Sequence, residues 1–277
     1  MEPLWCIGGD RRMLYTVRAL RENGRSVQTY GVPELDDTPL PERISRLILP
    51  FPSFLGGTLR AQNAIDAEAL VRRTGAGSAV FGGLFGQHRA AFEARGAEVI
   101  ELYGSEPLTT ENAVLTAEGA IGLAIAHSPF ALHGAQCLVI GCGRIGKALA
   151  ARLHALHTNV TVAARSAADL AYIEASGMRA EKTGLYRHGL GDYRFVFNTV
   201  PATVLTREQL AAVSPDCLLL ELASKPFGFS VEDCRALGLH ARSAPSLPAS
   251  FAAASAGAAY ADSILRALQA RERNDFS

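Results

Sequence analysis

Residues 137–153 read CLVIGCGRIGKALAARL, and this stretch decides how the middle of the chain folds. An apolar run from Ala135 to Ile140 leads into glycines spaced as G-x-G-x-x-G, and helix-forming residues follow them. A second apolar run, NVTVAA, occupies residues 159–164. A strand, a glycine-rich turn, a helix and a second strand in this order are typical of a domain that binds a dinucleotide on a parallel sheet. We therefore predict a Rossmann-like domain around this stretch.

Each glycine of the turn has its own physical reason. Gly141 permits the tight turn, Gly143 lets a pyrophosphate approach the backbone, and Gly146 lets the helix pack closely on the strand. Arg144 and Ile145 begin the helix, whose first amides would point at the phosphates. We predict that these five residues bind the cofactor.

The end of the second predicted strand distinguishes the two nicotinamide cofactors. Proteins that bind NAD usually place an acidic residue there for the ribose 2′-hydroxyl. Here the strand ends at Ala164, and Arg165 and Ser166 follow, with no acid before Asp169. An arginine can pair with a 2′-phosphate and lie on the adenine ring, and a serine hydroxyl can donate to the same phosphate. The sequence therefore favours NADP(H).

Two further apolar runs end in polar turns, which are predicted to flank the nicotinamide. The runs are Tyr193 to Phe197 and Cys217 to Leu222, and a helix from Val231 to Leu237 then precedes a short strand from Leu239 to Arg242. Ligands lie at the carboxyl ends of the strands in open α/β sheets. The first turn consists of Asn198, Thr199, Val200 and Pro201, and the second of Ala223, Ser224, Lys225 and Pro226.

The N-terminal part of the chain alternates between predicted strands and helices in the same way, which indicates a second parallel α/β domain. Its opening, Ile7-Gly8-x-x-Arg11, matches Ile140-Gly141-x-x-Arg144, but Asp10 and Met13 stand in place of Gly143 and Gly146. An aspartate beside a pyrophosphate is repulsive, so we expect no dinucleotide there. The predicted strands cover residues 4–8, 27–30, 46–49, 78–81 and 98–102, and the predicted helices cover residues 12–22, 66–73 and 88–95.

Two long helices are predicted to join the domains. Residues 109–127 are apolar nearly all round and stop before Pro129, with Thr109 or Thr110 as the N-cap, and a second helix rich in alanine follows Pro248. A helix that is apolar on every side belongs between packed layers. We predict an α/β fold of two Rossmann-like parallel-sheet domains joined by these helices, with the substrate cleft between the domains. The predicted parts are an N-terminal substrate or partner domain over residues 1–108, a connecting helix and loop over 109–133, the NADP-binding domain over 134–246, and a C-terminal helix over 247–277 that returns to the first domain.

The composition excludes several classes of function. The 277 residues carry 27 Lys and Arg against 27 Asp and Glu, which gives no basic surface for nucleic acid or an anionic membrane. No apolar run is long enough to span a membrane, and the N-terminus does not resemble a signal peptide. The five cysteines form no C-x-x-C pair, and no cluster has metal-ligand spacing. We expect reduced packing cysteines, no metal and a cytoplasmic protein.

Six motifs together resemble one family, the A subunits of dipicolinate synthase. They are I-G-G-D-R-R at 7–12, E-G-A-I-x-x-A-I-A-H-S-P at 118–129, G-x-G-R-x-G-x-x-L-A at 141–150, V-T-V-A-A-R-S-A-A-D-L-A at 160–171, F-N-T-V-P-A-x-V-L-T at 197–206 and L-A-S-K-P-x-G at 222–228. The resemblance implies oxidation of dihydrodipicolinate to pyridine-2,6-dicarboxylate with NADP, late in spore formation and in the mother cell. It also implies a flavoprotein-like B subunit of the same synthase as partner, and it leaves the formation of a homodimer open.

The chain departs from the family pattern near its C-terminus. Members usually have A-P-G-L-P-G followed by P-K-T-A-G, whereas this chain reads A-P-S-L-P-A at 244–249 and A-A-S-A-G at 253–257. The lysine is absent, and serine and alanine replace two glycines. If that lysine holds a substrate carboxylate in the family, this chain binds its substrate differently or less well.

The implied reaction removes a hydride and a proton from a ring dicarboxylate, so the protein needs carboxylate clamps, orientation and a base. Lys225 is the first candidate clamp, Asn198 and Thr199 would contact nicotinamide or substrate, and Arg11 could bind the second carboxylate from the other domain. Glu118 is the candidate base, because we expect its apolar helix to desolvate it and raise its pKa. The histidines that could serve instead are His88, His127 and His133.

Two other interpretations stay open. The chain could be another NADP-dependent dehydrogenase of a small acid, of the shikimate or 2-hydroxyacid type, since the N-T-V-P turn is shared with the first of these. It could also be a non-catalytic, cofactor-binding scaffold subunit, which the absent lysine favours.

Overall fold

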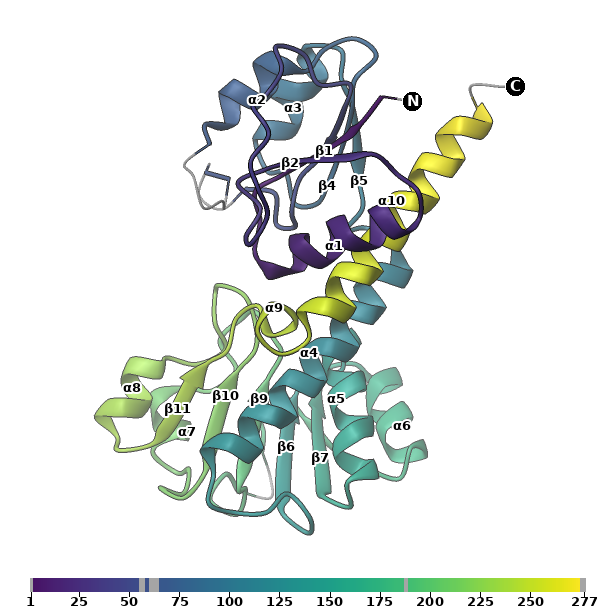
Figure 1. Ribbon diagram of the computed structural model, residues 1–277. Helices are drawn as coiled ribbons and strands as arrows, with labels where there is room; N and C mark the ends of the chain where they lie inside the picture. Colours follow the sequence, from purple (N-terminus) through teal and green to yellow (C-terminus); the bar gives the residue numbers. More distant parts are fainter. Residues whose placement is uncertain (1, 55–57, 60–64, 187–188, 275–277) are drawn as a thin grey trace. The chain divides into compact units, whose positions relative to one another are not determined.

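The computed structural model describes residues 2–54, 58–59, 65–186 and 189–274 (Figure 1). The chain divides into two compact units. Unit 1 comprises residues 1–112 and 252–277, and unit 2 comprises residues 113–251. The boundaries fall at 112/113 and 251/252, whereas the sequence led us to predict boundaries at 108/109, 133/134 and 246/247. Each unit is built on one parallel sheet, which confirms the predicted fold class.

The sheet of unit 2 has six strands in the order β11-β10-β9-β6-β7-β8, and every neighbouring pair is parallel. The strands are β6 (Gln136–Ile140), β7 (Asn159–Ala164), β8 (Arg179–Lys182), β9 (Phe195–Asn198), β10 (Leu218–Glu221) and β11 (His240–Ser243). The chain moves outward from β6 in one direction and then returns to build β9 on the other side. A dinucleotide binds at the carboxyl ends of the strands where the order reverses in this way, here between β6 and β9.

Helices cover both faces of this sheet, because the strands are apolar on both sides. One core packs α4, α5 and α6 on one face, and another packs α7 and α8 on the opposite face. The helices are α5 (Arg144–Ala155), α6 (Ala167–Ala175), α7 (Arg207–Leu210), α8 (Val231–Ala236) and α9 (Leu247–Phe251), together with α4 (Glu106–His127), which begins in unit 1 and ends in unit 2.

Unit 1 carries a five-stranded parallel sheet in the order β2-β1-β3-β4-β5. Its strands are β1 (Leu4–Ile7), β2 (Val27–Tyr30), β3 (Arg46–Ile48), β4 (Ala79–Gly82) and β5 (Glu98–Glu101), and its helices are α1 (Arg11–Glu22), α2 (Ala67–Arg73), α3 (His88–Ala94) and α10 (Ala253–Asn274). This 2-1-3-4-5 order is the second common order of doubly wound sheets. The two units therefore share a layered architecture but not a strand order.

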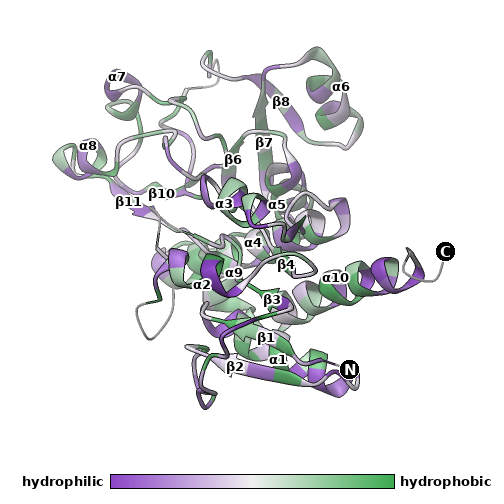
Figure 2. Ribbon diagram, turned by 90° about the horizontal axis from the view of Figure 1, so that it is seen from above, coloured by the Kyte–Doolittle hydropathy of each residue, from purple (hydrophilic) through white to green (hydrophobic). Residues whose placement is uncertain are grey.

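The C-terminal helix belongs to unit 1, where α10 lies along α1 (Figure 1). The contact is close because Gly257 has no side chain: a Cβ there would lie 2.4 Å from the carbonyl oxygen of Arg12. Thr16 Oγ1 also donates to the carbonyl of Gly257 at 3.1 Å. Both helices carry hydrophobic stretches, which contribute to one core of the unit (Figure 2). The small residues of the C-terminal segment thus serve helix packing.

Several local expectations were wrong. Helix α4 begins at Glu106, so Thr109 lies inside the helix and donates to the carbonyl of Ser105 at 3.0 Å instead of capping it. The helix predicted after Pro248 is divided into α9 and α10. Strand β8 has no apolar run and was not predicted, because R-A-E-K is polar and lies at a sheet edge.

Neither a membrane span nor a metal cluster occurs among the described residues. Within these residues no helix is long and apolar enough to cross a membrane. The same part of the chain contains no group of three or more His, Cys, Asp or Glu arranged to hold a metal ion. All five cysteines are free thiols, and four of them are buried.

Candidate functional site

The glycine-rich turn of unit 2 has no room for side chains at two of its three positions. Gly141 has φ +106°, and a Cβ there would lie 2.3 Å from Thr199 Oγ1. A Cβ on Gly146 would lie 2.0 Å from the carbonyl oxygen of Gly141, so this glycine lets α5 approach the turn. Gly143 is different, since a Cβ there would meet nothing within 4 Å. The backbone of Gly143 therefore faces open space, as it must if a pyrophosphate is to approach it.

The start of α5 is left uncapped by the protein. Gly143 is the N-cap residue, and it offers no side-chain hydrogen bond to the first turn of the helix. The free amides and the helix dipole at such a terminus attract a phosphate. The corresponding turn of unit 1 is filled instead, because the Asp10 carboxylate accepts from the Arg12 amide at 3.1 Å and from the Arg12 guanidinium at 2.9 Å.

A pocket of about 980 Å³ lies at the carboxyl ends of the central strands of unit 2. Residues from the predicted cofactor set that line it are Gly141, Gly143, Arg165, Ser166, Thr199, Val200 and Pro201. The predicted residues Arg144, Ile145 and Gly146 form the first turn of α5 beside the pocket and are not among its lining residues. Lining residues outside the predicted cofactor set are Cys142, Ala164, Asp169, Thr183, Gly184, Ala202, Thr203, Val204, Thr206 and Gln209. A nicotinamide dinucleotide fits this site, because open backbone and an uncapped helix terminus lie where its phosphates would be held.

Arg165 and Ser166 lie at one end of this pocket, after β7. The Arg165 side chain is exposed, whereas Ser166 caps α6 by accepting from the Asp169 amide at 3.0 Å. Ser166 also donates to Asp169 Oδ2 at 2.7 Å, so its hydroxyl is already engaged. The same hydrogen bond is the main reason why the pKa of Asp169 is lowered. Lys147 Nζ lies 3.4 Å from Asp169 Oδ1 and compensates its charge.

Cys142 is half-buried in the wall of the pocket. Burial, reinforced by the nearby Asp169 carboxylate, raises the pKa of this thiol above its ordinary value. A thiol that stays protonated is a poor nucleophile. Cys142 contributes to the shape of the pocket wall.

Asn198 does not reach the pocket, contrary to its predicted contact with nicotinamide or substrate. Its side chain is fully buried, and its amide nitrogen donates to Glu221 Oε1 at 2.7 Å and to the carbonyl of Val200 at 2.9 Å. Its amide oxygen accepts from the Val200 backbone at 3.1 Å. Asn198 thus shapes the turn whose next residues, Thr199 to Pro201, line the pocket.

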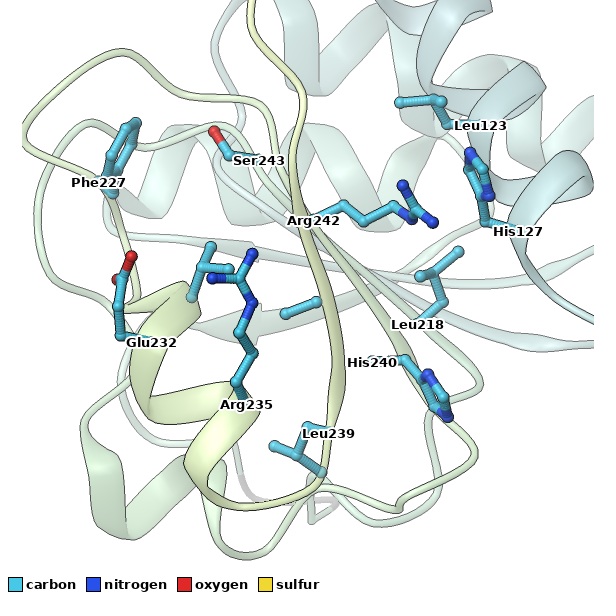
Figure 3. A pocket seen from close by; sticks show the side chains of 12 residues that line it. Leu123, His127, Leu218, Phe227, Glu232, Arg235, Leu239, His240, Arg242 and Ser243 are labelled. Carbon is cyan, nitrogen blue, oxygen red and sulfur yellow. The ribbon is translucent and has the colours of Figure 1, made fainter.

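Lys225 lies in the loop after β10, as predicted, with an exposed side chain. Its ammonium lies 6.0 Å from the centre of the Phe227 ring, and Lys225 lines neither of the hollows described in unit 2. Phe227 belongs to the second hollow, of about 620 Å³, at the outer strand β11 (Figure 3). Figure 3 shows Phe227 and Arg235 on one side of β11 and Arg242 and His127 on the other.

Glu118 is not desolvated, so the expectation that burial makes it the base was wrong. Its side chain is 56% exposed, and its carboxylate pairs with Arg152 at 3.5 Å. Helix α4 is apolar nearly all round, but Glu118 projects from the side that faces solvent.

The other candidates are dispersed. Arg11 begins α1 in unit 1, is 61% exposed and pairs with Glu34 at 3.0 Å. His88 packs its ring against Phe54, with centroids 4.3 Å apart, and His133 packs against His157 at 5.9 Å. His127 lines the hollow at β11. None of these described side chains lines the dinucleotide pocket.

The fold and the pocket define a dinucleotide-binding protein, and the comparisons support an oxidoreductase that uses a nicotinamide dinucleotide. Residues 108–220 match the family model described as D-isomer specific 2-hydroxyacid dehydrogenase, NAD binding domain. The A subunit of dipicolinate synthase from Bacillus subtilis (strain 168) is 30% identical over 287 residues, which cover 96% of each chain. The chain belongs to the family of dipicolinate synthase A subunits.

Two solved structures support the same assignment. The A subunit of dipicolinate synthase from Bacillus halodurans superposes with a TM-score of 0.87 at 27% identity, covering 96% of this chain and 97% of that one. The A chain of dipicolinate synthase from Bacillus subtilis superposes with a TM-score of 0.83 at 30% identity, covering 99% and 98%. The likeness extends through both units.

Proposed function

We propose that this protein oxidises dihydrodipicolinate to dipicolinate with NADP. The observation that carries the proposal is the 30% identity to the A subunit of a dipicolinate synthase along 96% of the chain. It is supported by a pocket with an open glycine turn and an uncapped helix terminus. In the reaction the substrate loses one hydride and one proton, and its ring becomes aromatic.

Preference for NADP over NAD rests on Arg165. Strand β7 ends at Ala164 without an acid, and the exposed Arg165 side chain follows directly on the pocket wall. Asp169 is the nearest acid, but its carboxylate is already bound by Ser166 and Lys147. An arginine that pairs with a 2′-phosphate through two hydrogen bonds favours the phosphorylated cofactor.

The chain's own residues bind and orient the reactants. NADP, when bound, accepts the hydride. The α5 terminus and Gly143 hold its phosphates, and the Thr199 to Pro201 turn limits where its nicotinamide end can lie. Lys225 is proposed to bind one substrate carboxylate, since burying an unpaired carboxylate is costly. We assign no base, because Glu118 is exposed.

We further propose a cytoplasmic protein that works with a second, different polypeptide, since the relative's name denotes one component of a larger enzyme. An NADP-dependent dehydrogenase of a small 2-hydroxy acid is the second candidate, because the family model matched by residues 108–220 is that of such enzymes. A non-catalytic scaffold is the third, in view of the A-A-S-A-G segment at 253–257.

Two measurements separate these candidates. Titration with NADPH and NADH gives the dissociation constants, and formation of dipicolinate from dihydrodipicolinate and NADP is followed by absorbance, with and without the B subunit. We expect tighter binding of NADPH and dipicolinate formation that depends on this chain. Oxidation of D-lactate or glycerate in place of dihydrodipicolinate supports the second candidate, and cofactor binding without any oxidation supports the scaffold.

A further inference from the structure

One buried carboxylate lies beneath the ends of two neighbouring strands of unit 2. Glu221, the last residue of β10, has no exposed surface. Its Oε1 accepts from Asn198 Nδ2 at 2.7 Å and from the Ala223 amide at 2.9 Å, and its Oε2 accepts from the amides of Gly228 at 2.9 Å and Phe229 at 3.3 Å. Every partner is a donor, so each of these hydrogen bonds favours the ionised carboxylate.

These hydrogen bonds close the loop that carries Lys225. Ala223 stands at its beginning and Gly228 and Phe229 at its end, and all three amides point at the same carboxylate. Lys225 lies between the two fixed ends. The loop is therefore anchored at both ends by one side chain, and the position of Lys225 depends on it.

The same carboxylate also reaches the turn of the dinucleotide pocket. Asn198, which it binds, holds the Val200 backbone through both its amide nitrogen and its amide oxygen. The carbonyl of Gly228 accepts from the amides of Val204, at 2.8 Å, and Leu205, at 3.1 Å. The pocket lining and the Lys225 loop are thus joined twice, once through Asn198 and once through Gly228.

Position 228 carries a glycine because the Asn198 side chain fills the space that a side chain there would need. A Cβ at position 228 would lie 2.2 Å from Asn198 Nδ2 and 2.5 Å from its Cγ, closer than packed atoms allow. Asn198, Glu221 and Gly228 therefore form one interlocked unit, which we call the strand-end unit. Packing and hydrogen bonding fix it independently of each other.

We infer that Glu221 is a positioning residue that sets the Lys225 loop and the Thr199–Pro201 turn in a fixed relation, so that substrate clamp and cofactor are held together. This inference rests on the proposed function for the roles of the loop and the turn. It adds a buried residue outside the pocket lining through which the loop and the turn are aligned. The effect of Glu221 on substrate binding should then pass through Lys225.

The test is Glu221→Gln, which keeps shape but turns one acceptor into a donor. We expect amide hydrogen exchange at Gly228 and Phe229 to rise about 10- to 100-fold, since hydrogen bonds to a charged group are lost. KM for dihydrodipicolinate should rise about tenfold with a smaller change in kcat. The NADPH dissociation constant should rise several-fold. Glu101→Gln is the matched control, because Glu101 accepts from the amides of Leu84 and Tyr103 in unit 1. In Glu101→Gln, amide exchange should rise at Leu84 and Tyr103 and stay unchanged at Gly228 and Phe229.

A double-mutant cycle separates positioning from mere stability. In a Lys225→Ala background, Glu221→Gln should leave KM nearly unchanged, because the group it positions is gone. Additive effects on KM, or unchanged exchange at Gly228 and Phe229 together with an unchanged NADPH dissociation constant, would overturn the inference. If the parent chain does not oxidise dihydrodipicolinate, the proposed substrate fails, while exchange and NADPH binding still decide the positioning role.

A second variant covers the case in which Glu221→Gln does not fold. Gly228→Ala keeps the carboxylate but displaces Asn198, so it should raise the NADPH dissociation constant and amide exchange at Val200. Unchanged values for both in Gly228→Ala would count against the strand-end unit.

Discussion

Asp10 in unit 1 and Gly143 in unit 2 occupy the same position, the N-cap of the helix that follows the first strand of their sheets. Asp10 satisfies the helix terminus with its own carboxylate and pairs with the nearly buried Arg12, whereas Gly143 leaves the terminus open. A capped terminus offers fewer amides to a phosphate, and a negative charge there repels one. The difference of one residue explains why we propose one cofactor per chain.

Gly143→Asp should abolish dinucleotide binding without unfolding unit 2. A Cβ at this position meets nothing within 4 Å, so the aspartate fits, caps α5 and repels the pyrophosphate. We expect the NADPH dissociation constant to rise at least about 100-fold, equivalent to roughly 2.7 kcal/mol. Calorimetric titration checks this, and the parent should bind one NADPH per chain. A parent stoichiometry of two would show that the turn containing Asp10 also binds cofactor.

Arg165→Ala should discriminate between the cofactors. Loss of a charge-assisted contact to the 2′-phosphate costs roughly 1.5–3 kcal/mol, about 10- to 150-fold in NADP affinity, and NAD lacks that phosphate. Affinities for both cofactors can be measured by fluorescence titration, with Asp169→Asn as the control. Equal weakening of NAD and NADP binding would contradict the assignment of Arg165.

Lys225→Ala should weaken the use of substrate while leaving NADPH affinity nearly unchanged. Lys225 lines no part of the dinucleotide pocket, so its loss should appear in KM for dihydrodipicolinate. An analogue with one carboxylate should be less affected, because its carboxylate can be bound by a group other than Lys225. Steady-state kinetics with both compounds measures this. Parent-like KM and kcat for the diacid would make Lys225 an ordinary surface residue.

The contribution of Glu221 to the free energy of unfolding should change with pH. Burial raises the pKa of Glu221 above its ordinary value of 4.5, against the lowering effect of Asn198 and the backbone amides. The folded state therefore binds the proton more tightly, and the stability this gives is present below pH 4.5 and is lost as the pH rises through the folded pKa. The unfolding free energy of the parent minus that of Glu221→Gln should fall with rising pH from 4.5 upward.

Urea unfolding followed by circular dichroism measures this difference. Tryptophan fluorescence is unsuitable, because the single tryptophan, Trp5, lies in unit 1 and reports on the other sheet. A difference that rises with pH would mean that the hydrogen bonds outweigh burial, and the pKa of Glu221 would then be lowered.

Gly257→Ala should destabilise unit 1, although alanine favours helices. Its Cβ would meet the Arg12 carbonyl at 2.4 Å, so α10 would have to move away from α1. Forced overpacking costs roughly 1–3 kcal/mol, more than the gain of about 1 kcal/mol in helix propensity. Trp5 fluorescence during urea unfolding reads this out, with the exposed Ser255→Ala as control. A stabilised variant would show that the two helices can separate at little cost.

The sequence predicted what depends on neighbouring residues. The cradle of Gly141, Gly143 and Gly146 is local, because turn, helix start and strand are contiguous, and Arg165 lines the pocket since it directly follows β7. Glu118 was misjudged for a related reason: a helix that is apolar nearly all round gives no periodicity from which to tell its solvent side.

What the sequence could not predict is assembled from distant positions. Asn198 and Glu221 are 23 residues apart, and nothing in either turn indicates that their side chains meet under the sheet. Polar residues at strand ends were interpreted as ligand contacts, because that is where ligands lie. In this protein the first residue of the Asn198 turn faces inward, and the residues after it line the pocket.

The strand-end unit also constrains how this family can diverge. A Cβ at 228 would lie 2.2 Å from the amide nitrogen of Asn198, so any side chain at position 228 requires that asparagine to move. Losing Asn198 alone would leave the carboxylate of Glu221 without its side-chain partner. Replacement of one of the three positions therefore weakens the contacts of the other two. In an alignment of natural relatives, 198, 221 and 228 should covary as one inherited block, while Lys225, exposed at the tip of the loop between them, is free to drift with substrate preference.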